Sequence, residues 1–228
     1  MGDLSLLAAD IVGPGGRVVG VDRDPGVVEH ARRRASEHGC SSRVSFETAH
    51  LHEFASDEPF DALVGRYILL YQPDPAGLIR YLLQFVKPGG IVVFHELDLT
   101  DLNPTYPPCA LYDKSYALLA EALRRAGIPP DFGRQLAKHL SDAGLPFPSL
   151  ASETVLGGGV GSYVYPGIAS TVISVAPRLE ALGLALPDGL AADHTMAPMI
   201  EEEAVRLQSQ VLAPTQFGAW TRRPLGPD

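Results

Sequence analysis

Asp22 is the residue whose type and position best suit ligand chemistry. It ends the apolar, β-branched stretch 17–22, and a carboxylate there can accept hydrogen bonds from both hydroxyls of a ribose diol. Gly2 lies 20 positions upstream, close to the spacing between a glycine-rich turn and the ribose acid of nucleotide-binding sheets. The competing interpretation is an exposed acid stabilised by a helix N-terminus, but Asp24 already suits the capping role. We therefore favour ribose binding at Asp22.

A second group of polar residues follows the apolar stretch 44–48. His50 and His52 flank Leu51 and precede Glu53, but a metal site needs a further ligand that the sequence does not identify. We therefore predict no metal, and a loop of surface histidines is one interpretation. The other is that His50 and Leu51 border a purine ring, and both interpretations stay open.

His95 and Glu96 follow the apolar stretch 91–94. They could polarise or deprotonate a substrate, or pair with arginines of a helical insert that follows. Cys40 and Cys109 are too few for a disulfide framework or a metal cluster. They are typical of reduced thiols in a cytoplasmic protein.

Strands and helices that could position these residues alternate through the first hundred residues. Apolar strands are predicted at 17–22, 44–48, 61–66 and 91–94, and helices at 4–12, from 25 and from 75. Asp-Pro pairs start two of the helices, and Lys87-Pro88-Gly89-Gly90 should separate the third helix from its following strand. Near-continuous apolar strands between amphipathic helices predict a parallel sheet covered on both faces, with ligands at its carboxyl edge.

The second half has a different character. We predict a helical cap insert over about 100–150, with helices at 110–127 and 131–143 and no strand. A strand at 152–156, helices at 166–183 and 192–208, and a last strand at 216–222 should follow. The glycine-rich stretch 157–161 lacks the lysine of a phosphate loop and is interpreted as a flexible connection. The tyrosines of the insert line a pocket or pack its core, with packing as the default: Tyr106, Tyr112 and Tyr116.

Composition limits the function classes. The 228 residues suit one domain, 1–228, and the net charge of −9 without a basic stripe argues against nucleic-acid partners. No apolar run approaches the roughly 18 residues of a membrane span, and the first residues lack the features of a signal peptide. We therefore expect a cytoplasmic protein with no membrane partner, and the oligomeric state is left open.

Several stretches together resemble class I S-adenosylmethionine-dependent methyltransferases, in the branch that acts on small molecules and carries a helical cap. The resemblance covers nearly the whole chain and rests on these pieces in this order: GDLSLLAA, VVGVDRDP, TAHLHEF, FDALVGRYILLYQPDP, LLQFVKPGGIVVFHE and FGAWTRRP. It implies a Rossmann-like, doubly wound α/β fold with a mostly parallel sheet and an antiparallel last strand. It also implies S-adenosylmethionine as cofactor and methyl transfer to an O, N or C nucleophile of a small molecule.

The resemblance also assigns roles to single residues. Gly2 corresponds to the last glycine of the cofactor loop, and Asp22 to the ribose acid, with Arg23 beside the adenine. His50 and Leu51 correspond to the pair at the adenine edge, although His50 replaces the usual carboxylate. Gly65 and Arg66 correspond to the backbone beside the methionine moiety.

The front of the chain departs from the family pattern. The first, central strand and the first two glycines of the loop are not found before Gly2, so we expect either a start codon placed too late or a handicapped fragment. Two rival functions stay open: a non-catalytic binding protein of the same fold, and an NAD-dependent oxidoreductase. The antiparallel last strand and the KPGG stretch favour the methyltransferase. We expect a small, partly apolar substrate under the cap, oriented by Glu96 or His95 and walled by the tyrosines.

Overall fold

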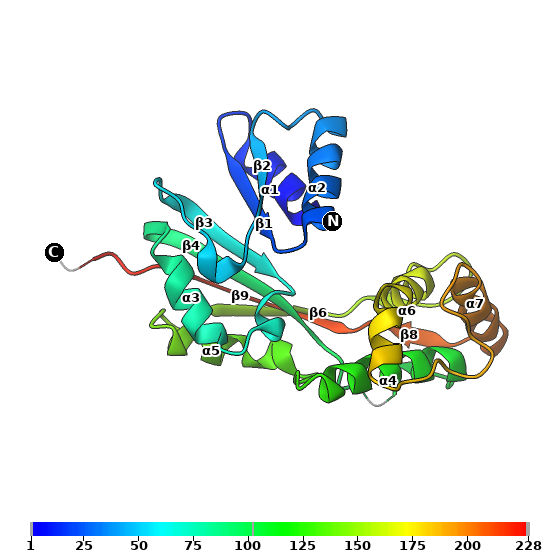
Figure 1. The fold of residues 1–228 in the computed structure, drawn as a ribbon. Helices are drawn as coiled ribbons and strands as arrows, with labels where there is room; N and C mark the ends of the chain where they lie inside the picture. Colours follow the sequence, from blue (N-terminus) through cyan, green and yellow to red (C-terminus); the bar gives the residue numbers. More distant parts are fainter. Residues whose placement is uncertain (1, 102, 227–228) are drawn as a thin grey trace.

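The computed structural model describes residues 2–101 and 103–226. Its N-terminal unit, the upper part of Figure 1, contains two parallel strands paired from Val18↔Val44 to Asp22↔Thr48. Two helices pack on these strands through a small apolar core. The elements are α1 (Asp3–Val12), β1 (Val18–Asp22), α2 (Pro25–Glu37) and β2 (Val44–Thr48).

Both predicted Asp-Pro helix starts are confirmed. The Asp24 carboxylate accepts hydrogen bonds from the backbone N–H groups of Gly26 and Val27, at 2.7 and 3.3 Å. Asp74 does the same for the N–H of Gly77 at 2.8 Å, at the start of α3 (Pro75–Leu83). In each case proline occupies the first helical position, where its missing N–H costs nothing.

A four-stranded sheet in the order β3-β4-β9-β6 forms the centre of the molecule. β3 and β4 are parallel, whereas β9 runs antiparallel to both β4 and β6. The predicted mostly parallel sheet with an antiparallel last strand is therefore confirmed. The strands and the short 3-10 turns around them are η1 (Leu51–Glu53), β3 (Phe60–Arg66), η2 (Leu69–Tyr71), β4 (Val86–Asp98), β6 (Ser149–Glu153) and β9 (Thr215–Arg222).

The KPGG stretch was predicted to precede its strand. In the structure it lies inside β4. Phe60 pairs with Val86 whereas Ala62 pairs with Ile91, so the four residues 87–90 of β4 stand opposite the single residue Asp61 of β3. Two hydrogen bonds hold this insertion: the Gly89 N–H donates to the Arg223 carbonyl, and the Arg223 N–H donates to the Gly90 carbonyl, both at 2.9 Å. The local sequence could not predict a strand that depends on a segment more than 130 residues away.

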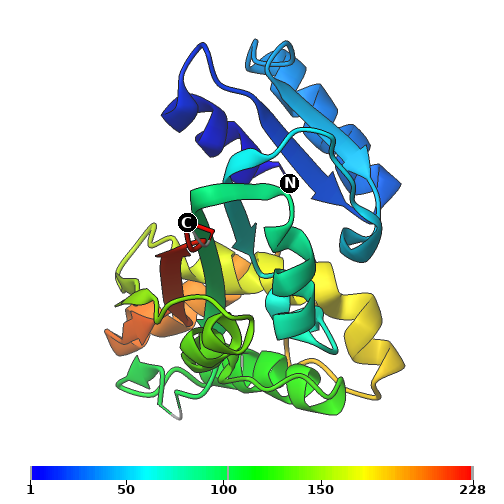
Figure 2. The same ribbon diagram turned by 90° about the vertical axis from the view of Figure 1, so that its left-hand side faces the viewer.

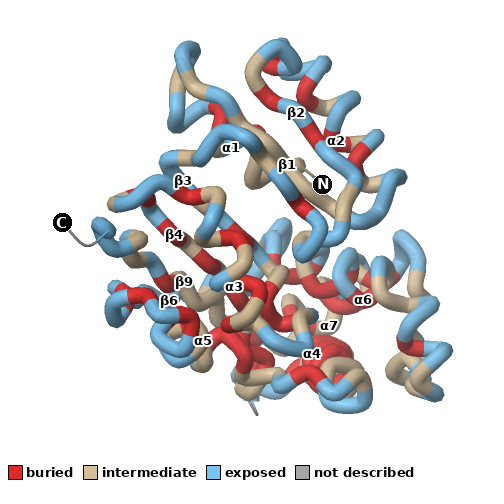
Figure 3. Tube along the Cα trace, turned by 60° about the vertical axis from the view of Figure 1, so that its left-hand side comes forward, coloured by how far each residue is buried: buried red, intermediate tan, exposed pale blue. Residues whose placement is uncertain are grey.

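Helices cover one face of the four-stranded sheet. α3 and α5 (Leu136–Asp142) pack on it through a core in which Leu78, Ile79 and Phe94 are almost completely buried. The opposite face is more open, because Val64, Ile91 and Trp220 each expose more than a third of their surface. The expectation that both faces are covered is therefore wrong for this sheet. Figure 3 shows the buried segments gathered along β4 and around α4 and α5.

The cap differs in extent from the predicted insert at 100–150. Its core joins α4 to two later helices and includes Tyr112 and Tyr116, whereas η3 and α5 pack on the central sheet. A small antiparallel sheet, β5-β8-β7, closes the cap. The bounds are β5 (Thr105–Tyr106), α4 (Ala110–Arg125), η3 (Phe132–Gln135), β7 (Leu156–Gly157), α6 (Val164–Ala181), α7 (Met196–Leu207) and β8 (Gln210–Leu212).

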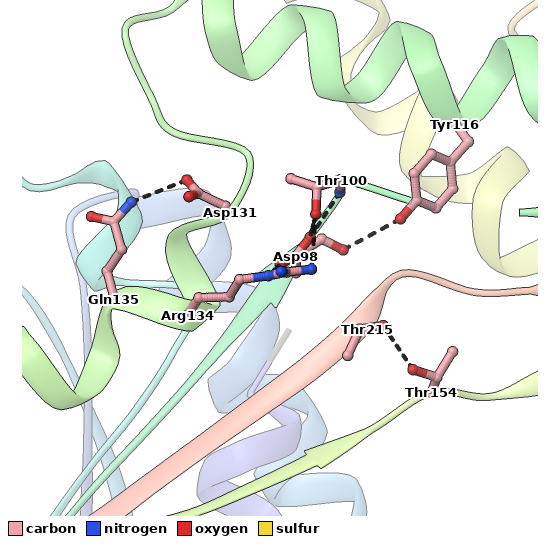
Figure 4. Close-up of polar contacts among 8 residues, drawn as sticks. All are labelled: Asp98, Thr100, Tyr116, Asp131, Arg134, Gln135, Thr154 and Thr215. Atoms are coloured by element: carbon pink, nitrogen blue, oxygen red, sulfur yellow. Dashed lines mark hydrogen bonds and ion pairs between the residues drawn. The ribbon is translucent and has the colours of Figure 1, made fainter. Parts of the chain in front are cut away.

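The strand predicted at 152–156 is in fact the end of one strand and the start of another. β6 ends at Glu153 in the central sheet, and β7 begins at Leu156 in the cap sheet. Between them the hydroxyls of Thr154 and Thr215 hydrogen-bond at 2.7 Å, where both segments leave the central sheet (Figure 4). In the part of the chain that the structure describes, no helix has both the length and the apolarity to cross a bilayer.

Candidate functional site

A cleft of about 730 Å³ lies between the N-terminal unit and β3. β1 pairs with β2, and β3 with β4, so the cleft separates the remaining edges of the two sheets; Figure 2 shows the N-terminal unit beside β3. It runs along both strands from their amino ends, at Arg17 and Asp61, to their carboxyl ends. The predicted site residues that line it are Gly2, Asp22, Leu51, Gly65 and Arg66.

Asp22 stands at the carboxyl end of β1 with a fixed orientation. Its Oδ1 accepts a hydrogen bond from the Asp24 N–H at 2.9 Å, and its carbonyl accepts one from the Ala49 N–H at 3.1 Å. Among the described residues Oδ2 has no hydrogen-bond partner and so can accept from a ligand. The arrangement suits a ribose hydroxyl.

Gly2 closes the cleft at the N-terminus of α1. Its backbone is left-handed, with φ at +75°, and a Cβ there would lie 3.0 Å from the Cβ of Ala31. Only glycine fits both constraints without strain. Gly20 has a related role in β1, because a Cβ would lie 2.7 Å from the Ser5 hydroxyl and 2.6 Å from the Phe46 ring. Gly2 thus lets the start of α1 approach α2, and Gly20 lets α1 approach β1; residues of the first helical turn border the cleft.

Four predicted site residues do not line the cleft. Arg23 and His50 are exposed beside it, although their neighbours Asp22 and Leu51 line it. The other two, His95 and Glu96, lie on β4 behind the residues that border the cleft.

Glu96 is completely buried and bonded to backbone. Its Oε1 accepts hydrogen bonds from the N–H groups of Ile68 and Leu69, at 3.0 and 2.8 Å. Burial raises the pKa of this carboxyl to about 7, against the opposing effect of the backbone donors. The predicted alternative of arginine partners is wrong, since backbone amides take that place.

Tyr67 connects His95 to the cleft and was missed by the sequence analysis. It lines the cleft with φ at +56°, and its hydroxyl donates to Gln216 Oε1 at 2.6 Å. The Arg66 guanidinium lies 4.9 Å from the centre of its ring, and the His95 ring lies 5.6 Å away. Nothing local in GRYILLY signals a left-handed tyrosine, because its anchor is 149 residues away.

Asp98 joins the end of β4 to the elements that follow. It is 2% exposed and accepts hydrogen bonds from the Thr100 N–H at 2.7 Å and the Thr100 hydroxyl at 2.5 Å. Arg134 of η3 forms an ion pair with it, and the Tyr116 hydroxyl donates to its carbonyl at 3.4 Å (Figure 4). The chain thus enters the cap through a fixed junction.

Two of the three predicted pocket tyrosines pack the cap core. Tyr112 and Tyr116 are almost completely buried, and Tyr106 is 81% exposed. The default interpretation of packing is therefore confirmed for two, and the expectation that all three wall a substrate pocket is wrong. Within the described residues, no group of three or more His, Cys, Asp or Glu side chains could hold a metal ion.

Comparisons with known proteins agree with this geometry. Residues 1–127, more than half of the chain, match the family described as a methyltransferase domain. A 37.1 kDa protein of transposon TN4556 from Streptomyces fradiae is 31% identical over 153 residues, 67% of this chain and 42% of that protein. The ubiquinone biosynthesis O-methyltransferase of Serratia proteamaculans (strain 568) is 31% identical over 93 residues, 41% of this chain and 39% of that enzyme.

The matched segments thus span about two fifths of the length of these curated relatives. Among solved structures, the [4+2]-cyclase SpnF matches with a TM-score of 0.54 at 20% identity, over 99% of this chain and 72% of that one. At that identity the likeness shows the fold alone.

Proposed function

Because the chain belongs to the methyltransferase-domain family, we propose that it binds S-adenosylmethionine at the carboxyl ends of β1 and β3 and methylates a small molecule. The observation that carries the proposal is that Asp22 and Gly2 both line the same cleft. The residues fit the cofactor, since Asp22 keeps Oδ2 for a ribose hydroxyl and Gly2 has no Cβ to fill the space at α1.

Each lining residue then has a role in holding the cofactor. Asp22 binds the ribose, Leu51 borders the adenine, and Gly65 with Arg66 lies along the methionine moiety. Arg23 and His50, which are exposed at the edge of the cleft, contact the adenine only from its outer side. When bound, S-adenosylmethionine supplies a methyl group on a positively charged sulfur that a nucleophile can displace.

His95 is our candidate for a residue that positions Tyr67, because His95 does not line the cleft itself. Burial and the nearby Arg66 charge lower its pKa, so the imidazole is neutral near pH 7. Its Nδ1 has no hydrogen-bond partner among the described residues, and its ring lies 5.6 Å from that of Tyr67, which lines the cleft. In-line positioning in a dry site contributes the rest of the catalysis.

The acceptor is proposed to be a small molecule with an O, N or C nucleophile. The match to a ubiquinone biosynthesis O-methyltransferase supports a small acceptor, and the net charge of −9 opposes binding to nucleic acid. We also propose a cytoplasmic location, because Cys40 and Cys109 are both unpaired and buried.

Binding of S-adenosylhomocysteine, measured by calorimetry, tests the cofactor assignment. Asp22→Asn should weaken binding at least tenfold, since a hydrogen bond to a charged group contributes about 1.5–3 kcal/mol. Asp61→Asn is the matched control, because it removes the same charge at the opposite end of the same cleft. Equal affinities of the wild type and Asp22→Asn, with both folded, would contradict the assignment.

Turnover needs a separate measurement, because one fold hosts several chemistries, as the match to a cyclase illustrates. Release of S-adenosylhomocysteine is followed with a panel of phenols, amines and activated carbon acids. Methylated product from any of these supports the enzyme proposal. Tight cofactor binding without product from the whole panel would favour the non-catalytic binding protein.

A further inference from the structure

The segment Tyr67–Leu69, which we call the rim, connects β3 to η2 at the carboxyl end of the cleft. Tyr67 and Ile68 line the cleft, and Leu69 is completely buried in the core below it. Tyr67 also pairs with β4, because its N–H donates to the His95 carbonyl at 3.0 Å. The position of these three residues therefore decides the shape of the cleft at its reactive end.

The rim needs an anchor from outside its own sequence. The left-handed backbone of Tyr67 is unfavourable for a residue with a Cβ, and the turn that follows begins with unpaired N–H groups. Ile68 precedes η2 but has no polar side-chain atom to cap it. Glu96 supplies the missing acceptor from β4, where a single carboxyl oxygen receives two rim N–H groups.

We propose that Glu96 is a positioning residue for the cofactor: a neutral carboxyl group holds the rim closed on the cleft, and ionisation of that group favours opening. This inference rests on the proposed function, because the cofactor is the ligand that the closed rim would contact. A neutral carboxyl group still offers a carbonyl oxygen to Ile68 and Leu69. An ionised one needs more solvation than two amides provide, and opening the rim admits water.

The surroundings of Glu96 support this direction. Its Oε2 is buried and has no hydrogen-bond partner among the described residues. Burial raises the pKa of Glu96 from its ordinary 4.5 to about 7. The closed rim therefore binds the proton more tightly than a solvated rim does. By linkage, closing becomes roughly tenfold less favourable between pH 6 and pH 8.

Of the other titratable groups near Glu96, the tyrosines do not account for a transition in this range. The charge of Glu96 acts on the phenols of Tyr67 and Tyr71. Burial raises the pKa of both phenols above its ordinary value of 10.0, so both are neutral between pH 6 and pH 8. Three further groups are Asp98, Arg178 and His95. Asp98 is ion-paired with Arg134 of η3, and the charge of Arg178 of α6 acts on Tyr71. His95 lies on the same strand as Glu96, and the charges of Arg66 and Glu153 act on it. Of these, His95 is the group whose titration must be separated from that of Glu96.

The test is S-adenosylhomocysteine affinity of the wild type between pH 6 and pH 8, with Glu96→Gln and His95→Gln as partners. We expect wild-type affinity to fall about tenfold across this range. Glu96→Gln keeps the acceptor oxygen without an ionisable group, so its affinity should be constant and should equal the wild-type value at pH 6. His95→Gln removes the neighbouring imidazole and should keep the wild-type profile.

Three outcomes would overturn the proposal: a flat wild-type profile, weaker binding by Glu96→Gln at every pH, or a profile flattened equally by His95→Gln. Any titration of S-adenosylhomocysteine itself affects all three proteins equally, so it does not change the differences between their affinity profiles. If the wild type binds no S-adenosylhomocysteine at any pH, the proposed function fails, and the amide resonances of Ile68 and Leu69 then test Glu96 directly. They should shift with a midpoint near pH 7 in the wild type, and the absence of that midpoint would refute the role of Glu96.

Discussion

Substitution of Asp98 tests whether the end of β4 is the structural junction between sheet and cap. Its buried carboxylate accepts two hydrogen bonds from Thr100 and pairs with Arg134, whose side chain is 59% exposed (Figure 4). Asp98→Ala removes all three interactions and leaves the Thr100 N–H beside a small cavity. Asp98→Asn keeps an acceptor for Thr100 and removes the ion pair.

The expected magnitudes follow from those contacts. A hydrogen bond to a charged group contributes about 1.5–3 kcal/mol, and contributions within one network do not add fully. We therefore expect Asp98→Ala to lower the free energy of unfolding by about 2–4 kcal/mol. Asp98→Asn should cost about 1–2 kcal/mol, because an ion pair with a solvent-exposed partner is weak.

Urea unfolding followed by fluorescence gives the free energies, since the single tryptophan, Trp220, lies in β9 of the same sheet. Asp131→Ala is the control, because its carboxylate bonds to Gln135 at 3.1 Å on the same connection. A loss below about 1 kcal/mol for Asp98→Ala would refute the junction, as would an equal loss for Asp131→Ala.

Two further outcomes follow from buried groups. Gly65→Ala should lower the free energy of unfolding, measured in urea, by about 1–3 kcal/mol, because the new Cβ would lie 2.5 Å from the buried Phe94 ring. Gly15→Ala is the control and should leave the free energy of unfolding unchanged, because its Cβ meets nothing within 4 Å. Burial raises the pKa of the Cys109 thiol to about 12, and Glu203 adds to the effect, so the thiol stays neutral at pH 8. Cys109 should therefore react with Ellman's reagent only after unfolding. Fast labelling of Cys109 in the native protein would contradict this.

Local chemistry was enough to predict most elements of the first half. Asp24 and Asp74 each cap a helix within three residues of themselves, so their signal is contained in a short stretch of sequence. Asp22 could be found for the same reason, since it ends a β-branched strand directly before such a cap. Gly2 was found from its spacing to Asp22, and its left-handed backbone explains why glycine stands there.

The features that were mispredicted depend on partners distant in sequence. Residues 87–90 lie inside a strand because Arg223 pairs with them, and Tyr67 adopts its backbone because Gln216 holds its hydroxyl. The cap was placed too early because its core joins α4 to helices that begin after residue 160. Periodicity describes one element at a time and carries no information on such pairings.

The same distinction explains the position of Glu96. Alternation along β4 places it on the buried face with Phe94 and Asp98, whereas His95 faces the other way, so two adjacent residues predicted to act together serve different surfaces. One side of the cleft is built on the small apolar core of the N-terminal unit and the other on the larger core of the central sheet. Val19 and Val21 of β1 pack against that larger core, so the strand that ends in Asp22 is positioned by both. A cofactor held between Asp22 and the rim would therefore contact both parts, and at the rim a buried acid accepts the backbone N–H groups of Ile68 and Leu69.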